Sequence, residues 1–144
     1  PPKPNVKLAT LPIYRESRRL AMASEHPLAR KTEITPVEMS AEPYLDRLHC
    51  EFRSTLIKHF MDRNIVMRPR FHSEREDWVQ QMVAIGAGIC ALPDRSIIVD
   101  GIVLRPVKGL DLSREVSLVA LSGSGNPREV RKILSMASQF DWSL

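Results

Sequence analysis

Short strand-like runs and helical patterns alternate along this chain, and the alternation limits the possible folds more than any other feature. Strands that alternate with helices form mainly parallel sheets with helices on both faces. The strand candidates are a run ending at Ser24, then 44–45, 65–71, 89–92, 102–107 and 116–121. The sequence therefore predicts an α/β fold with three layers and a mainly parallel or mixed sheet.

Helix signals stand between these runs. Thr35 can cap a helix that has Pro36 in its first turn, and Glu38 can reach back to the amide of the cap. Ser73 and Glu76 repeat this capping-box spacing. A further helix is predicted over 51–63, and a last one is capped by Asn126 and starts at Pro127, with an apolar stripe at Val130, Ile133, Leu134, Ala137 and Phe140.

Two glycines stand between the third helical pattern and the strand that follows it. Gly86 and Gly88 permit a sharp turn from helix to strand, because a positive φ costs glycine little. The continuous apolar run Ile89 to Leu92 fits a buried strand, which Pro93 stops.

Length and composition indicate one soluble globular domain. The chain has 144 residues, of which 43% are hydrophobic and 26% are charged. No apolar stretch approaches the ~20 residues that cross a bilayer, and the first four residues lack the apolar core of a signal peptide. We therefore expect a cytoplasmic protein that does not contact membranes.

The residue pattern argues against catalysis and against a metal or cofactor. Cys50 and Cys90 are the two cysteines, and their spacing forms neither a disulfide framework nor a zinc site. The four histidines share no metal-ligand spacing, and the chain has no GxSxG, Walker or HExxH motif. We expect this chain not to be an enzyme.

The net charge is +4, and its densest basic group is Arg68, Arg70 and Arg75. An excess of positive charge can reflect an anionic ligand or nearby DNA, and the alternative is an ordinary solvated surface.

Four segments, taken in order and with their spacing, resemble the effector-binding domain of LysR-type transcription regulators. They are LPIYRE at 11–16 with HPLA at 26–29, EPYL at 42–45, VAIGAGICALP at 83–93, and VLRPV at 103–107 with REVSLV at 114–119. The resemblance covers about residues 11 to 142.

The resemblance implies a two-lobed module like the periplasmic binding proteins, with a small effector in the cleft between the lobes. It implies a linker and hinge strand over 1–17, the second lobe over 18–115, and a hinge strand with a C-terminal helix returning toward the first lobe over 116–144. Most of the first lobe and the winged-helix DNA reader would then lie outside this sequence, so we expect a fragment with no nucleic-acid contact of its own. Because family members assemble as dimers and tetramers through these domains, the resemblance also implies that this chain self-associates as a dimer or tetramer.

In such a fold, ligands bind where strands end and helices begin. Arg47, His49 and Cys50 follow one strand, while His72 and Ser73 close another. Free amides at the helix starts favour an anion, and Arg47 can add a bidentate contact. We predict that these five residues line the effector site, against the alternative that they cap helices and face solvent.

Cys50 supports a second hypothesis. Peroxide-sensing family members carry a reactive cysteine in a similar His-Cys context, and a helix start with Arg53 nearby would favour the thiolate. Against this, Glu51 adjoins the thiol, and no second cysteine follows within a dozen residues. A ligand-free oligomerisation module is a third alternative.

A stand-alone solute-binding protein of a transporter is a further alternative. It is disfavoured because such a protein would need a signal peptide and both lobes.

Overall fold

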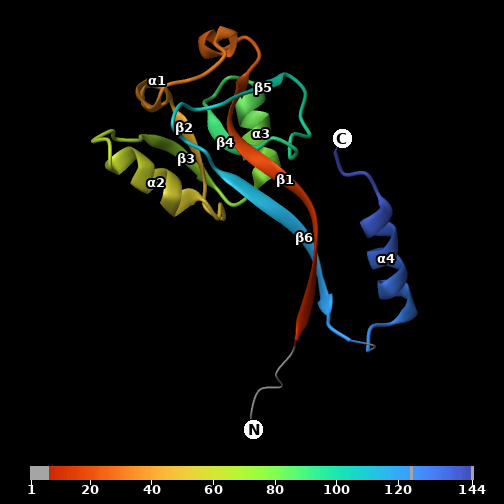
Figure 1. Ribbon diagram of the computed structural model, residues 1–144. Coiled ribbons are helices and arrows are strands. Elements are labelled where there is room, and N and C mark those ends of the chain that lie inside the picture. Colours follow the sequence, from red (N-terminus) through yellow and green to blue (C-terminus); the bar gives the residue numbers. More distant parts are fainter. Residues whose placement is uncertain (1–6, 124, 144) are drawn as a thin grey trace. The chain divides into compact units, whose positions relative to one another are not determined.

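The computed structural model describes residues 7–123 and 125–143, which form two compact units. The larger unit is Ser17–Leu112, and the smaller one joins the chain up to Glu16 to the chain from Ser113 onward. Figure 1 labels the elements of both units. The assignment of lobes and hinge strands to particular residues stays a prediction.

The larger unit contains a mixed sheet in which the second half of β1 (Leu8–Ala23) is central. This half of β1 runs antiparallel to β4 (Cys90–Pro93) on one side and to β5 (Ile102–Arg105) on the other. β2 (Tyr44–Arg47) and β3 (Pro69–Ser73) form a parallel pair. A parallel bridge between Tyr44 and Ile89 connects that pair to β4. The order is therefore β3-β2-β4-β1-β5, which confirms the α/β fold in its mixed form.

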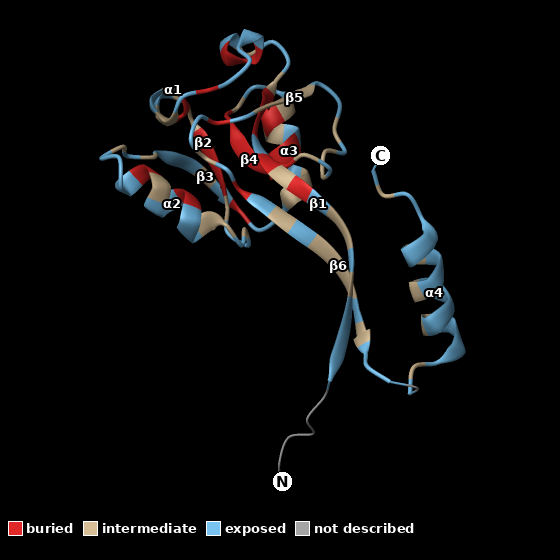
Figure 2. Ribbon diagram, in the orientation of Figure 1, coloured by how far each residue is buried: buried red, intermediate tan, exposed pale blue. Residues whose placement is uncertain are grey.

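Helices cover both faces of this sheet, because side chains alternate along its buried strands. From β1, Leu20 and Met22 pack with Phe60 of α2 (Arg53–Met61), whereas Ala21 between them packs with Val79 and Val83 of α3 (Glu76–Ala84). The first face also receives α1 (Pro36–Ala41) and the 3₁₀ turn Pro27–Arg30. Figure 2 shows the buried residues concentrated between these elements.

The capping box predicted at Thr35 is confirmed. The Thr35 hydroxyl accepts a hydrogen bond from the Glu38 amide at 3.3 Å, and the Glu38 carboxylate accepts one from the Thr35 amide at 2.9 Å. The prediction that the third helix ends just before Gly86 is also confirmed, since α3 stops at Ala84 and Gly86 has φ +77°.

Gly88 departs from the prediction, because it does not adopt a positive φ. It is buried, and a Cβ placed on it would lie 2.5 Å from the Pro43 carbonyl oxygen. Glycine is required here for close approach of two backbones, while Gly86 supplies the turn.

Two predicted caps are wrong. Ser73 ends β3, and its hydroxyl accepts from the Arg75 amide at 2.9 Å, so Arg75 takes the N-cap position of α3 without a side-chain cap. Asn126 donates to the Leu121 carbonyl at 2.6 Å, and Pro127 is the N-cap of α4 (Arg128–Gln139). Both side chains stabilise turns in place of helix starts. The strand predicted over 65–71 begins only at Pro69.

The smaller unit pairs the first half of β1 with β6 (Ser113–Leu121) and adds α4. Glu16 is its one buried residue in the part of the chain that the structure describes. Glu16 forms an ion pair with Arg114, and Trp142 donates to the Ala137 carbonyl at 2.9 Å. No helix among the described residues has the length and apolar character that spanning a membrane requires.

Candidate effector-binding site

The carboxyl ends of β2, β3 and β4 meet at one edge of the larger unit's sheet. Arg47 and Ser73 are register partners at the ends of β2 and β3. Arg18 of the antiparallel β1 pairs with Pro93, the last residue of β4, so it lies at the same edge. We call these strand ends, together with Arg18 and the helix starts that follow the strands, the carboxyl edge.

A buried carboxylate organises the middle of the carboxyl edge. Asp46 accepts hydrogen bonds from Arg53 Nε at 2.9 Å and from Arg53 Nη2 at 2.7 Å, and His72 Nδ1 lies 3.1 Å from the same carboxylate. The hydrogen bonds to Asp46 raise the pKa of the Arg53 guanidinium. His72, a predicted site residue, therefore has its Nδ1 engaged by the protein, while half of its side chain stays exposed.

Arg47 is a predicted site residue that retains free donor capacity. Its side chain is 13% exposed and forms an ion pair with Glu76 through Nη2, whereas Nη1 is buried without a hydrogen-bond partner. Glu76 in turn accepts from Gln80 at 3.5 Å. Gln80 is buried and binds the Ser96 carbonyl at 2.8 Å and the Ile98 amide at 2.9 Å, so Arg47 is connected to the segment that follows β4.

Arg18 was missed by sequence reasoning. Its side chain is 2% exposed, and Nη2 lies 2.6 Å from a carboxylate oxygen of Glu51. The guanidinium carbon stands 4.9 Å from the centre of the Phe52 ring. Nη2 is held by this ion pair, whereas Nε and Nη1 are buried without a hydrogen-bond partner. Arg18 also lines a groove of ≈ 430 Å³ with the segment 106–111.

The other three predicted residues occupy different positions on this edge. Ser73 is buried, and its hydroxyl binds both the amide and the carbonyl of Arg75. His49 is an exposed side chain that lies 3.3 Å from Glu74. Cys50 is half-buried and lines a groove of ≈ 510 Å³ with Arg53 at the start of α2.

Cys90 lies in β4 and is fully buried, and burial raises the pKa of its thiol far above the usual range. Both cysteines are free thiols. Among the described residues, no group of three or more His, Cys, Asp or Glu side chains is placed to hold a metal ion.

Comparison with known proteins establishes the family. Residues 1–141 match the family model described as the LysR substrate binding domain. The chain therefore belongs to the LysR substrate-binding-domain family, the class of regulatory domains with the fold of periplasmic binding proteins.

Two relatives illustrate the match at the sequence level. The transcriptional regulator MetR of Escherichia coli (strain K12) is 34% identical over 82 residues, covering 57% of this chain and 26% of that protein. The hydrogen peroxide-inducible genes activator of Haemophilus influenzae is 23% identical over 134 residues, covering 89% of this chain and 44% of that protein. The chain thus spans less than half the length of either relative.

Solved structures share the fold at low sequence identity. The CcmR regulatory domain of Synechocystis PCC6803 in complex with 2-PG aligns with a TM-score of 0.75 and 18% identity, covering 96% of this chain and 69% of that one. The effector binding domain of QuiR in complex with shikimate aligns with a TM-score of 0.69 and 17% identity, covering 91% and 63%.

Proposed function

We propose that this chain is the effector-sensing part of a LysR-type transcription regulator and that it binds a small anion at the carboxyl edge. The observation that carries the proposal is Arg47, whose Nη1 is buried there without a hydrogen-bond partner; Arg18 at the same edge keeps Nε and Nη1 in the same state while its Nη2 is ion-paired with Glu51. A buried donor without a partner costs about 1–3 kcal/mol, and more when it is charged. The oxygens of a bound anion would supply the missing acceptors, with the short geometry of charge-assisted hydrogen bonds.

The start of α2 adds to the attraction for an anion. Its N-cap is Phe52, which provides no side-chain cap; the Arg53 amide donates to the Cys50 carbonyl at 3.0 Å, and the other amides of the first turn have no capping side chain. Shikimate, which QuiR binds, is a carboxylate. A small carboxylate is therefore the ligand class that we propose for this chain.

The Arg47–Glu76 ion pair suggests how binding would be communicated. An anion on Arg47 competes with Glu76, and Glu76 contacts Gln80, which holds the segment containing Ser96 and Ile98. Binding would then shift the population between two arrangements of this segment. The size of the shift is limited by the ratio of the anion's affinities for the two arrangements. The proposal also includes self-association of these domains. It further includes a DNA-binding region, outside this sequence, whose affinity for DNA changes with this shift. Catalysis has no part in it.

A thermal-shift titration tests the proposal. Shikimate, 2-oxoglutarate, benzoate and inorganic phosphate serve as probes, with Arg47→Gln as the variant and Arg30→Gln as a control that removes an exposed charge outside the site. We expect a saturable rise in melting temperature that Arg47→Gln abolishes and Arg30→Gln retains, because a ligand that binds the native state stabilises it by mass action. Equal rises in both variants would contradict binding at Arg47, and no rise with any probe would contradict anion binding by this chain. The second result would favour the oligomerisation module.

Oxidation of Cys50 is the second candidate function, favoured by the groove that the half-buried Cys50 lines together with Arg53 and by the Haemophilus relative. The Cys50 thiolate would attack one oxygen of hydrogen peroxide and break the O–O bond, forming a sulfenic acid while the second oxygen leaves as hydroxide and takes a proton from solvent. Mass spectrometry after peroxide and dimedone treatment should find the adduct on Cys50 and none in Cys50→Ser. An unmodified Cys50 at micromolar peroxide would exclude this function.

A further inference from the structure

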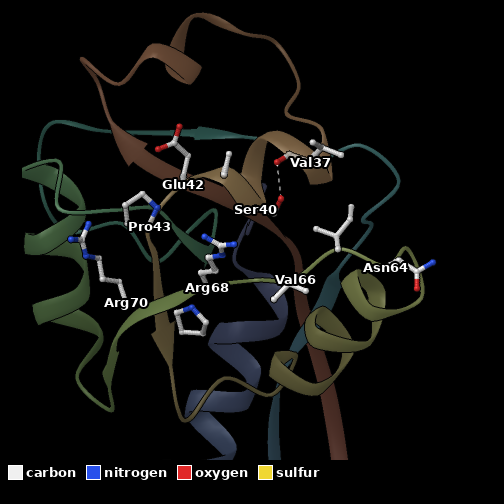
Figure 3. A pocket seen from close by; sticks show the side chains of 11 residues that line it. Val37, Ser40, Glu42, Pro43, Asn64, Val66, Arg68 and Arg70 are labelled. Atoms are coloured by element: carbon white, nitrogen blue, oxygen red, sulfur yellow. Dashed lines mark hydrogen bonds between the residues drawn. The ribbon is translucent and has the colours of Figure 1, made fainter.

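A groove of ≈ 730 Å³ lies at the opposite edge of the same sheet from the proposed effector site. It is formed by the end of α1, the approach to β2 at Pro43, and the segment 64–70 that leads into β3. Figure 3 shows the side chains around it. Since β2 and β3 enter the sheet here and end at Arg47 and Ser73, the length of a strand, about 10–15 Å, separates the two places. We call it the amino-edge groove.

Apolar side chains form much of its lining although they face solvent. Val37 is 65% exposed and Val66 is 74% exposed, and Pro43, Ile65 and Pro69 extend the apolar surface between them. The volume lies within the range of small-molecule sites. An apolar body placed in the groove would remove these side chains from water.

Two arginines give the groove its charge. Arg68, just before β3, and Arg70, within β3, both line the groove (Figure 3). Within residues 7–123 and 125–143, neither guanidinium has an ion-pair or hydrogen-bond partner. The acidic side chain of the groove, Glu42, lies 3.5 Å from His26 Nε2. Two guanidinium groups and one carboxylate leave a net positive charge beside the apolar surface.

We propose that the amino-edge groove is a second ligand site, which binds a small molecule with an apolar body and one carboxylate group. The apolar body covers Val37, Pro43 and Val66, and the carboxylate takes the free donors of Arg68 and Arg70. Bidentate contact with a guanidinium gives such an anion both affinity and orientation. Glu42 opposes the ligand's charge and lowers its affinity.

The test is a titration of the ¹⁵N-labelled chain with cyclohexanecarboxylate, followed by amide chemical shifts. Cyclohexanecarboxamide, of nearly the same shape but uncharged, is the matched probe. We expect saturable shifts of the amides in 37–42 and 64–70 with the carboxylate and much weaker ones with the amide. Arg68→Gln/Arg70→Gln should weaken binding by about tenfold, as expected for hydrogen bonds to a charged group. Glu42→Gln should strengthen it by about twofold.

Controls separate this site from general attraction of anions. Arg128→Gln/Arg131→Gln removes the same charge from exposed positions of α4 and should leave the affinity unchanged. Shifts confined to the carboxyl edge, equal binding of the uncharged amide, or unchanged affinity in Arg68→Gln/Arg70→Gln would each overturn the proposal. Weaker binding in Glu42→Gln would also overturn it, because the carboxylate of Glu42 would then be a ligand contact.

Discussion

Replacing Gly88 with alanine should disrupt the joint between two parts of the larger unit's sheet. The added Cβ would lie 2.5 Å from the Pro43 carbonyl oxygen and 3.1 Å from the Leu45 side chain. That carbonyl already accepts a hydrogen bond from the Ile89 amide at 2.9 Å, and the Leu45 amide donates to the Ile89 carbonyl at 2.9 Å. Backbone, unlike the end of a side chain, cannot move aside without loosening these two hydrogen bonds.

The magnitude follows from these contacts. Overpacking a well-packed core costs about 1–3 kcal/mol, and each weakened hydrogen bond adds up to about 1 kcal/mol. We expect Gly88→Ala to lower the free energy of unfolding by about 2–4 kcal/mol. With a urea m-value of about 1.5–2 kcal/mol/M, the unfolding midpoint should fall by about 1–3 M.

Gly86→Ala is the matched control, because it adds the same methyl group two residues earlier. Gly86 has φ +77°, and nothing lies within 4 Å of its added Cβ. The left-handed backbone alone costs alanine about 1–2 kcal/mol, partly offset by the stiffer unfolded chain. Urea unfolding of both variants, followed by circular dichroism, should show the larger loss for Gly88→Ala. Equal losses at equal m-values would refute the argument from close approach.

Three further predictions concern charge and thiol chemistry. The hydrogen bond from Lys31 lowers the pKa of Glu38 to about 2, so its stabilising effect is complete above about pH 4.5 and is lost as the pH falls toward 2. Glu38→Gln should therefore reduce the drop in urea midpoint between about pH 5 and about pH 3, and an unchanged drop would contradict this assignment. Asp46→Asn removes the charge of a buried carboxylate held by a guanidinium and should cost about 2 kcal/mol in urea unfolding, whereas a loss within error of zero would contradict it. Ellman's reagent should modify Cys50 rapidly and Cys90 only on unfolding, so a fast phase that persists in Cys50→Ser would be contrary evidence.

Features set by a few adjacent residues were predictable from the sequence. The Thr35 capping box and the end of α3 near Gly86 each depend on residues within one helical turn. The same local reasoning failed at Ser73, where a turn to Arg75 uses the hydroxyl that a helix start would have needed. The choice between a parallel and a mixed sheet depends on which distant strands pair, and local patterns do not contain that information.

The candidate site shows the same division. Arg47, His72 and Ser73 were predicted at the ends of strands, and the structure places them at one sheet edge. Arg18 reaches that edge only because β1 runs antiparallel to β4, so no spacing near position 18 revealed it. An arginine two residues before the apolar run that starts at Leu20 was the available signal, and the structure shows its guanidinium buried and ion-paired with Glu51.

The central position of β1 has a consequence for biosynthesis. The half of β1 in the larger unit is made before all its other strands, yet Leu20 pairs with Ala91 and Arg105, near the end of Ser17–Leu112. At about 5–20 residues per second, translation leaves this apolar strand without its neighbours for roughly 5–15 s. During that interval the nascent chain offers Leu20 and Met22 to any chaperone or unpaired strand nearby. The ribosome therefore has to complete β5 before the middle of the sheet can close.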